Sequence, residues 1–283
     1  MEFWQSVAFL DTEQLIEVAV ASEAAGYHGI TLSDHVVFPE KLTSKYPYSA
    51  DGAPRWDGTT DWPDPWVAIA AMAAVTQHLR FTTNIFVAPA RNPLLLAKSV
   101  ATAATLANGR VSLGASAGWM REEFDLLGVD FTTRGKRLDE MVDVLRLLWS
   151  GDMVEHHGEF FDFDRLQMRP APASTIPVLG GGHSEPALRR AARLDGWIGN
   201  AYKPDDAIEY LDRLDRYRRQ AGTADRDNYQ IILGLIAWPD RDLCQAFEER
   251  GVTGLLSAPW QVYPDLPIVE AITTFADAIG LAR

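Results

Sequence analysis

Two titratable side chains directly follow a short apolar stretch of the chain. Residues 29–33 have the composition of a strand, and Asp34 and His35 come next. A histidine at a strand end can hydrogen-bond a ligand or exchange a proton near neutral pH. The alternative is a histidine that only caps the strand or packs against the following loop. We take His35 as the candidate catalytic residue and Asp34 as the neighbour that orients it.

A run of three glycines marks a second candidate site. Gly180, Gly181, Gly182 and His183 stand between the apolar residues 176–179 and a helical pattern. Glycine lets the backbone approach a ligand closely, and a helix N-terminus offers free N–H groups and partial positive charge. The run therefore predicts a loop that binds a phosphate. The alternative is a tight turn that needs glycine for its backbone angles, since the spacing is neither Walker A nor GxGxxG.

Small and polar residues follow two further predicted strands. Residues 80–89 read as a strand that runs into a shaped turn, so we expect residues 84–91 to line a site. Residues 116–119 follow another strand, and small side chains there allow a flat ring to lie against the backbone. They would serve equally well in helix–strand packing. Just beyond them, the acidic side chains of Glu122, Glu123 and Asp125 predict a solvated face.

Other kinds of catalytic site find no support in the sequence. There is no Ser-His-Asp arrangement and no nucleophile elbow. The histidines show no metal-ligand spacing, and His156 and His157 read as part of a solvated hairpin, so we expect no metal. Cys244 lies in a helical pattern that predicts packing. A site with neither nucleophile nor metal suggests that a cofactor carries the chemistry.

Strand-then-helix units position these residues. The predicted strands cover residues 3–9, 29–33, 80–89, 110–115, 176–179, 195–199, 229–237 and 253–258. Helical patterns follow each of them, with caps expected at Asp11, Asp64, Thr132 or Thr133, and Ser184. Eight such units predict an α/β fold with a closed parallel barrel, in which residues 1–283 form one domain and the active site lies at the carboxyl ends of the strands.

Two excursions interrupt the alternation. Residues 36–63 are rich in aromatic residues, proline and glycine, which predicts a lid. We expect residues 40–62 to be more mobile than the strands when no cofactor or substrate is bound. Residues 156–168 alternate like a hairpin.

Charge and composition narrow the functional classes. A net charge of −13 argues against nucleic acid or an anionic membrane as a partner. The single cysteine leaves no internal disulfide and suits a reducing cytosol. We see neither a signal peptide nor an apolar stretch of membrane-spanning length. We therefore expect a cytoplasmic protein.

With these motifs assembled, the chain resembles the luciferase-like monooxygenase superfamily, and most of all its branch of oxidoreductases that use the deazaflavin coenzyme F420. The likeness covers nearly the whole chain and is carried by residues 33–39, 79–93, 108–124, 134–141 and 177–199. It implies a single (β/α)8 TIM barrel of the bacterial luciferase-like type with loop insertions. It also implies a cis peptide at Asn84-Ile85, in a bulge that backs the cofactor ring.

The resemblance assigns further roles by position. Asp34 and His35 match a pair that lies beside the ring in deazaflavin relatives. The turn that flanks the ring is matched by Ala115, Ser116, Ala117 and Gly118. Gly181, Gly182 and His183 match the loop that binds the cofactor phosphate. Trp119 stands where sugar-phosphate-oxidising relatives have a glutamate proton donor, so we do not expect that activity.

The sequence thus predicts an oxidoreductase that transfers a hydride between F420 and a small organic substrate, with His35 handling the proton. The first alternative is a monooxygenase that uses reduced FMN and oxygen. The second is a barrel that binds a cofactor without catalysing a reaction. By likeness to the family, we expect a homodimer.

Overall fold

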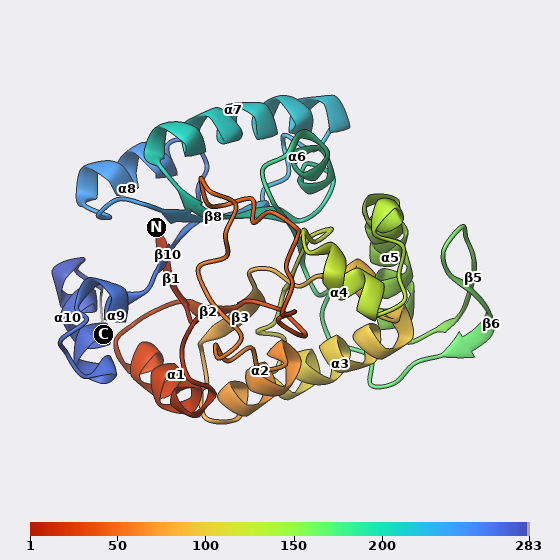
Figure 1. The fold of residues 1–283 in the computed structure, drawn as a ribbon, viewed down its shortest axis with the longest axis horizontal. Coiled ribbons are helices and arrows are strands. Elements are labelled where there is room, and N and C mark those ends of the chain that lie inside the picture. The colour runs from red at the N-terminus through yellow and green to blue at the C-terminus, as the bar shows by residue number, and fades with distance from the viewer. Residues whose placement is uncertain (282–283) are drawn as a thin grey trace.

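Eight parallel strands form one sheet in the computed structural model, which describes residues 1–281 (Figure 1). In hydrogen-bonding order they are β3 (Arg80–Thr83), β2 (Gly29–Leu32), β1 (Glu2–Ser6), β10 (Gly254–Ser257), β9 (Gln230–Leu235), β8 (Gly196–Tyr202), β7 (Val178–Gly181) and β4 (Leu113–Ala115). Each neighbouring pair in this order is parallel. The predicted α/β barrel is confirmed.

The barrel closes between β3 and β4 through two isolated bridges, Phe81 to Val111 and Phe86 to Ala115. Between them the chain bulges, and the Thr83 hydroxyl both donates to the Gly114 carbonyl (2.7 Å) and accepts from the Gly114 amide (3.1 Å). This side chain replaces ladder hydrogen bonds that the bulge removes. A Cβ at Gly114 would overlap the Thr83 carbonyl, so the contact requires glycine. The Asn84-Ile85 peptide within the bulge is cis, as expected.

Helices surround the barrel on its outside (Figure 1). The longer ones are α1 (Leu15–Ala24), α2 (Pro65–Ala74), α3 (Pro93–Leu106), α5 (Arg134–Trp149), α7 (Pro204–Ala221), α8 (Arg241–Glu248) and α10 (Ile268–Ala278). Shorter helices are η1 (Thr12–Gln14), η2 (Ala88–Ala90), α4 (Arg121–Leu126), η3 (Phe131–Thr133), α6 (Glu185–Ala191) and α9 (Pro259–Val262). None of the helices within residues 1–281 has the length and apolar character needed to cross a bilayer.

Helix caps explain several of these boundaries. The Asp64 carboxylate accepts hydrogen bonds from the second and third amides of α2, and the Asn92 side chain does the same for α3. The cap predicted at Asp64 is thus confirmed. Asp11, Thr133 and Ser184 occupy N-cap positions, but their side chains make no capping hydrogen bond. At Asp11 the backbone carbonyl accepts from the Gln14 amide, and the Thr12 amide donates to the Asp61 carboxylate.

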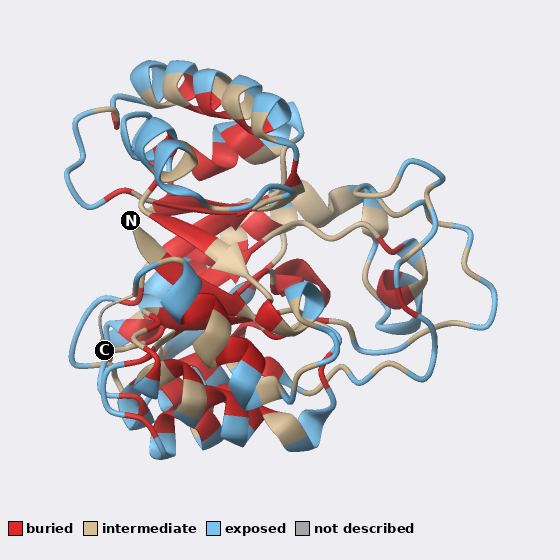
Figure 2. Ribbon diagram, turned by 90° about the vertical axis from the view of Figure 1, so that its left-hand side faces the viewer, coloured by how far each residue is buried: buried red, intermediate tan, exposed pale blue. Residues whose placement is uncertain are grey.

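The core has two layers. Apolar side chains between strands and helices form the larger one, and Figure 2 shows the buried strands inside helices whose outer faces are exposed. A smaller cluster fills the barrel itself and contains Trp4, Leu179, Ile198 and Ile232, with Ile85 and Leu256 packed against it. Because Ile85 belongs to the bulge, the barrel interior supports that segment directly.

The two predicted excursions differ in character. Residues 153–167 form the expected hairpin of β5 (Met153–His157) and β6 (Asp162–Gln167), which projects from the barrel. Residues 36–63, which we call the lid, contain no helix or strand and cross in front of the barrel, in orange in Figure 1.

Candidate active site

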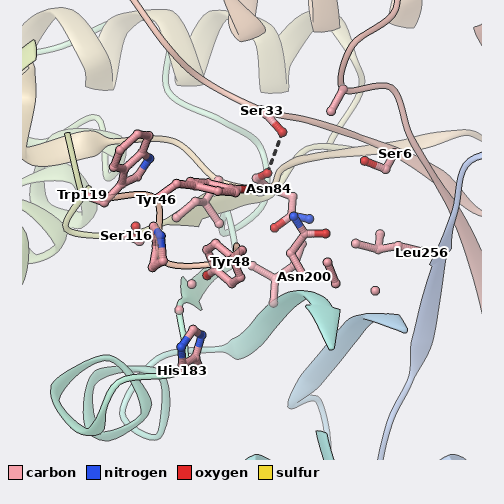
Figure 3. Close-up of a pocket in the computed structure, with 18 of the residues that line it drawn as sticks. Ser6, Ser33, Tyr46, Tyr48, Asn84, Ser116, Trp119, His183, Asn200 and Leu256 are labelled. Carbon is pink, nitrogen blue, oxygen red and sulfur yellow. Dashed lines mark hydrogen bonds between the residues drawn. The ribbon is translucent and has the colours of Figure 1, made fainter. Parts of the chain in front are cut away.

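A cavity of about 1120 Å³ opens at the carboxyl ends of the strands (Figure 3). Every strand of the barrel contributes to it, through Ser6, Ser33, Asn84, Ser116, Gly181, Asn200, Gly234 and Ser257. This is where ligands bind in barrels of this kind. The volume is at the upper end of the range for small-molecule sites, so it has room for a large cofactor together with a substrate.

Most predicted site residues meet in this cavity. They are Asp34, His35, Asn84, Ile85, Ser116, Ala117, Gly118, Gly181, Gly182 and His183. The exceptions are Ala115 and Gly180, which do not line it. Ala115 is buried in the seam where the barrel closes, and the backbone of Gly180 packs against Ala191. These two residues therefore support the wall from behind.

The sequence led us to expect that Asp34 orients His35, but the structure does not place Asp34 in that role. Its carboxylate accepts hydrogen bonds from the Arg91 guanidinium (2.7 Å) and the Val87 amide (2.9 Å). The side chain is buried, and burial raises the pKa of Asp34 to about 6, although Arg91 and the Val87 amide act in the opposite direction. Asp34 thus ties the end of β2 to the turn after the bulge.

The partner of His35 is Glu123, on α4. One Glu123 oxygen lies 3.1 Å from His35 Nδ1, and the other accepts from the Val36 amide at 2.7 Å. The expectation of a solvated face is wrong here, because Glu123 is only 3% exposed. Its neighbour Glu122 is also engaged, since it accepts from the Thr43 and Ser44 amides. The lid covers this side of α4, and backbone amides of the lid donate hydrogen bonds to both carboxylates.

The Glu123 carboxylate is ionised at neutral pH. Burial on its own would raise the pKa of Glu123, but the hydrogen bond and charge of His35, together with the amides of Val36 and Val37, lower it below its ordinary value. A negative charge is therefore held beside the His35 ring at the cavity wall.

Aromatic rings surround His35. The rings of Trp56 and Trp62, from the lid, lie 4.9 Å and 5.0 Å from it between centroids, and Trp119 lies 5.9 Å away. Tyr46 packs on both Trp56 and Trp119. The side of the cavity near His35 is consequently walled by uncharged ring faces.

His183 lies in different surroundings at the other side of the cavity. Its ring stacks on Tyr210 with centroids 5.1 Å apart and contacts the lid residue Tyr48 at 5.2 Å. Tyr202 completes the group, with its hydroxyl 3.4 Å from His183 Nδ1. Burial lowers the pKa of His183, and the charge of Arg213 acts in the same direction. His183 is therefore neutral at neutral pH. Figure 3 shows His183 and Tyr48 in one group, apart from Trp119.

The glycine run is not a simple loop between strand and helix. Gly180 and Gly181 are the last residues of β7, and only Gly182 has a positive φ, of 96°. A Cβ at Gly181 would lie 2.5 Å from Ile85 Cγ2. Glycine is thus needed at position 181 because the strand passes close to the bulge, and at position 182 for the backbone angle.

Comparison with known proteins identifies the family. The luciferase-like monooxygenase family matches residues 5–259. The chain belongs to the luciferase-like monooxygenase family. Its members are oxidoreductases. An uncharacterised protein of Mycobacterium tuberculosis is 37% identical over 268 residues, which are 94% of this chain and 92% of that protein.

Proteins with named activities resemble the chain in sequence or in fold. The FMNH2-dependent dimethylsulfone monooxygenase of Pseudomonas fluorescens is 34% identical over 212 residues, covering 74% of this chain and 54% of that enzyme. Among solved structures, an F420-dependent secondary alcohol dehydrogenase in complex with an F420–acetone adduct superposes with a TM-score of 0.76 at 17% identity, over 100% of this chain and 99% of that one. The latter likeness shows the shared fold.

The cavity of this luciferase-like chain suits a ring cofactor with an anionic tail. Ile85 lines the cavity with an apolar side chain, and Figure 3 shows the side chains of Asn84 and Asn200 in the same cavity. Arg134, which the sequence analysis missed, lines the same cavity and donates to the Gly118 carbonyl at 3.1 Å. Its guanidinium also donates to the Phe131 carbonyl (2.9 Å) and lies over the Phe131 ring, and no ion pair with a carboxylate is found for it within residues 1–281. The signal in the sequence that could have found Arg134 was its position at the start of a long helical pattern.

Proposed function

We propose that this protein transfers a hydride between F420 and an uncharged small organic substrate, with His35 exchanging the proton. The observation that carries this proposal is the place of His35. It lies in the cavity that contains the Asn84-Ile85 bulge, and it is paired with a buried carboxylate. A protonatable group at such a position is what oxidation of an alcohol or reduction of a carbonyl requires.

Each part of the cavity has a task in this reaction. F420, when bound, supplies or accepts the hydride. The bulge at Ile85 would support the ring, and Gly182 and Arg134, which line the same cavity, would hold the anionic part of the cofactor. When a carbonyl is reduced, its carbon gains the hydride and its oxygen gains a proton from His35. In the reverse direction His35 takes the hydroxyl proton. The lid rings exclude water from this step.

The walls around His35 favour an uncharged substrate that carries a ring. Tyr46, Trp56, Trp62 and Trp119 offer ring faces, and both nearby carboxylates are already hydrogen-bonded. A charged substrate would lose hydration against these ring faces. Trp119, in place of a glutamate, further argues against a sugar phosphate.

A second candidate function is a monooxygenase that uses reduced FMN and oxygen. The 34% identity with the dimethylsulfone monooxygenase favours it. The same bulge and the same Arg134 could serve FMN, since both cofactors combine a flat ring system with a phosphate.

We also propose that the protein forms a homodimer through α2 and α3. Val67, Leu95 and Leu106 on these helices are exposed although they are apolar. Light scattering at micromolar concentration tests this, and a monomer would contradict it.

Binding titration decides between the cofactors. Purified protein is titrated with F420 and with FMN, each followed by its absorbance, and then assayed with a panel of uncharged cyclic ketones and alcohols. We expect F420 to bind more tightly and to be oxidised or reduced with members of the panel. Selective FMN binding with oxygen consumption would establish the monooxygenase instead.

A further inference from the structure

The histidine and the lid share one carboxylate. Glu123 uses one oxygen for His35 Nδ1 (3.1 Å) and the other for the Val36 amide (2.7 Å), with the Val37 amide at 3.5 Å. Val36 is the first residue of the lid. Glu122, the preceding residue, binds the lid at a second place, where it accepts hydrogen bonds from the amides of Thr43 (2.7 Å) and Ser44 (3.0 Å).

This geometry constrains the protons of His35. Since an ionised carboxylate only accepts hydrogen bonds, Nδ1 must be the donor. In the neutral ring Nε2 then carries the lone pair, because the bond made by one nitrogen sets the state of the other. Within the described residues 1–281, Nε2 has no hydrogen-bond partner, and His35 lines the cavity. Nε2 is thus the nitrogen that is free to meet a ligand.

Other charged groups near His35 are already engaged. Asp34, the adjacent residue, is held by Arg91 and the Val87 amide. Within the described part of the chain, residues 1–281, Glu123 is the only group hydrogen-bonded to the His35 ring.

We infer that Glu123 is a positioning residue: it fixes His35 in the Nδ1–H form, directs Nε2 into the cavity, and does so only when the start of the lid is docked on the same carboxylate. This inference rests on the proposed role of His35 in proton exchange. It adds that lid position and the state of the histidine are coupled. A lid displaced at Val36 would free one oxygen of Glu123 and release the constraint on the ring.

Glu123→Gln is the decisive variant. A carboxylate has two acceptor oxygens, whereas the glutamine amide has one. Val36 N–H and His35 Nδ1–H cannot both keep their acceptor, and an amide NH2 facing Nδ1 would favour the Nε2–H form. Glu122→Gln is the matched control, because it makes the same change one residue away without touching His35.

The measurement is a long-range ¹H–¹⁵N spectrum of protein labelled in its histidines, recorded without cofactor at a pH where the ring is neutral. His35 is assigned by its loss in His35→Asn. We expect His35 to be Nδ1–H in the wild type and in Glu122→Gln, and mainly Nε2–H in Glu123→Gln. In turnover assays Glu123→Gln should lower kcat about 10- to 100-fold with little change in KM.

Two results would overturn the inference. One is a wild-type His35 in the Nε2–H form, which can be seen without any variant and so holds even if Glu123→Gln fails to fold. The other is a folded Glu123→Gln that keeps the Nδ1–H form. Because the spectra need no cofactor, failure to bind F420 would refute the proposed function and leave the positioning role to be decided by the spectra.

Discussion

The two histidines of the cavity are held in opposite ways. His35 is hydrogen-bonded to a buried carboxylate, and a second carboxylate, Asp34, lies beside it. His183 contacts three tyrosines and, among residues 1–281, is bonded to no carboxylate, and burial lowers its pKa. We call the surroundings of His35 the charged side of the cavity and those of His183 the ring side.

The difference bears on the two tasks that the sequence analysis predicted, proton exchange at His35 and cofactor binding at His183. On the charged side, the Glu123 carboxylate lies 3.1 Å from Nδ1 of the imidazole and fixes one face of the ring. On the ring side, a neutral imidazole offers only a flat surface and weak hydrogen bonds. If a cofactor phosphate binds near His183, positive charge can come from Arg134, Lys45 or Arg55, which line the same cavity.

The largest effect should follow from removing the proton-handling group on the charged side. His35→Asn keeps a polar side chain but cannot exchange a proton, so we expect turnover of the best substrate in the panel to fall about 10²- to 10⁴-fold. The dissociation constant of F420, measured by absorbance titration, should change little. An equal loss of turnover in His183→Asn would remove the distinction between the two sides.

The next effect concerns pH. The ordinary pKa of Asp34 is 3.8, and burial raises it to about 6 in the folded protein. The folded state therefore binds this proton more tightly than the unfolded chain. The resulting stabilisation is complete below pH of about 4 and is lost as the pH rises through about 6, which amounts to roughly 3 kcal/mol.

Asp34→Asn should abolish that contribution. We expect the free energy of unfolding of the wild type, relative to the variant, to fall by about 3 kcal/mol between pH of about 4 and 7 in urea titrations. Asp125→Asn, an exposed carboxylate on α4, serves as the control and should show no such trend. A constant difference between wild type and Asp34→Asn over this range would contradict the raised pKa.

A smaller effect is expected from a change at the contact between Gly181 and Ile85, which both line the cavity. Ile85 and Gly181 are in close contact, and Gly181→Ala would force Ile85 to move because the added carbon lies 2.5 Å from Cγ2. Overpacking of this kind costs about 1 to 3 kcal/mol of stability. Because Ile85 would support the ring, F420 affinity should fall as well. Gly58→Ala in the lid, where the added carbon makes an ordinary contact of 3.5 Å, is the matched control for thermal unfolding.

Local signals account for what the sequence predicted well. Each strand-and-helix unit is encoded within about 30 residues, as at Asp64 and Asn92, where cap and proline lie next to each other. The alternation of such units then determines the barrel, and the barrel brings strand ends together. That is why Asp34, His35, Asn84 and Gly182 could be assigned to one cavity.

Long-range packing accounts for what was missed. Glu123 and His35 are 88 residues apart, and nothing in the local sequence around Glu123 distinguishes a solvated acidic helix from one covered by a lid. The lid has no ladder of its own, so its amides need acceptors from elsewhere. Likewise, Gly181 looked like a turn residue because the reason for glycine there is Ile85, a residue of another strand end.

The smallest effect should come from the ring side. His183→Phe keeps a flat ring between Tyr48 and Tyr210 and removes only the two nitrogens. If His183 serves as a neutral surface, the dissociation constant of F420 should rise less than about tenfold, or 1.4 kcal/mol.

Arg134→Gln should weaken F420 binding more, by about 1.5 to 3 kcal/mol, since it removes a charged donor to the anion. Both constants are measured by titration at several pH values. A loss in His183→Phe that exceeds the loss in Arg134→Gln, and that grows as the pH falls, would show a protonated His183 bound to phosphate. The ring side would then carry charge as well, and the contrast between the two histidines would not hold.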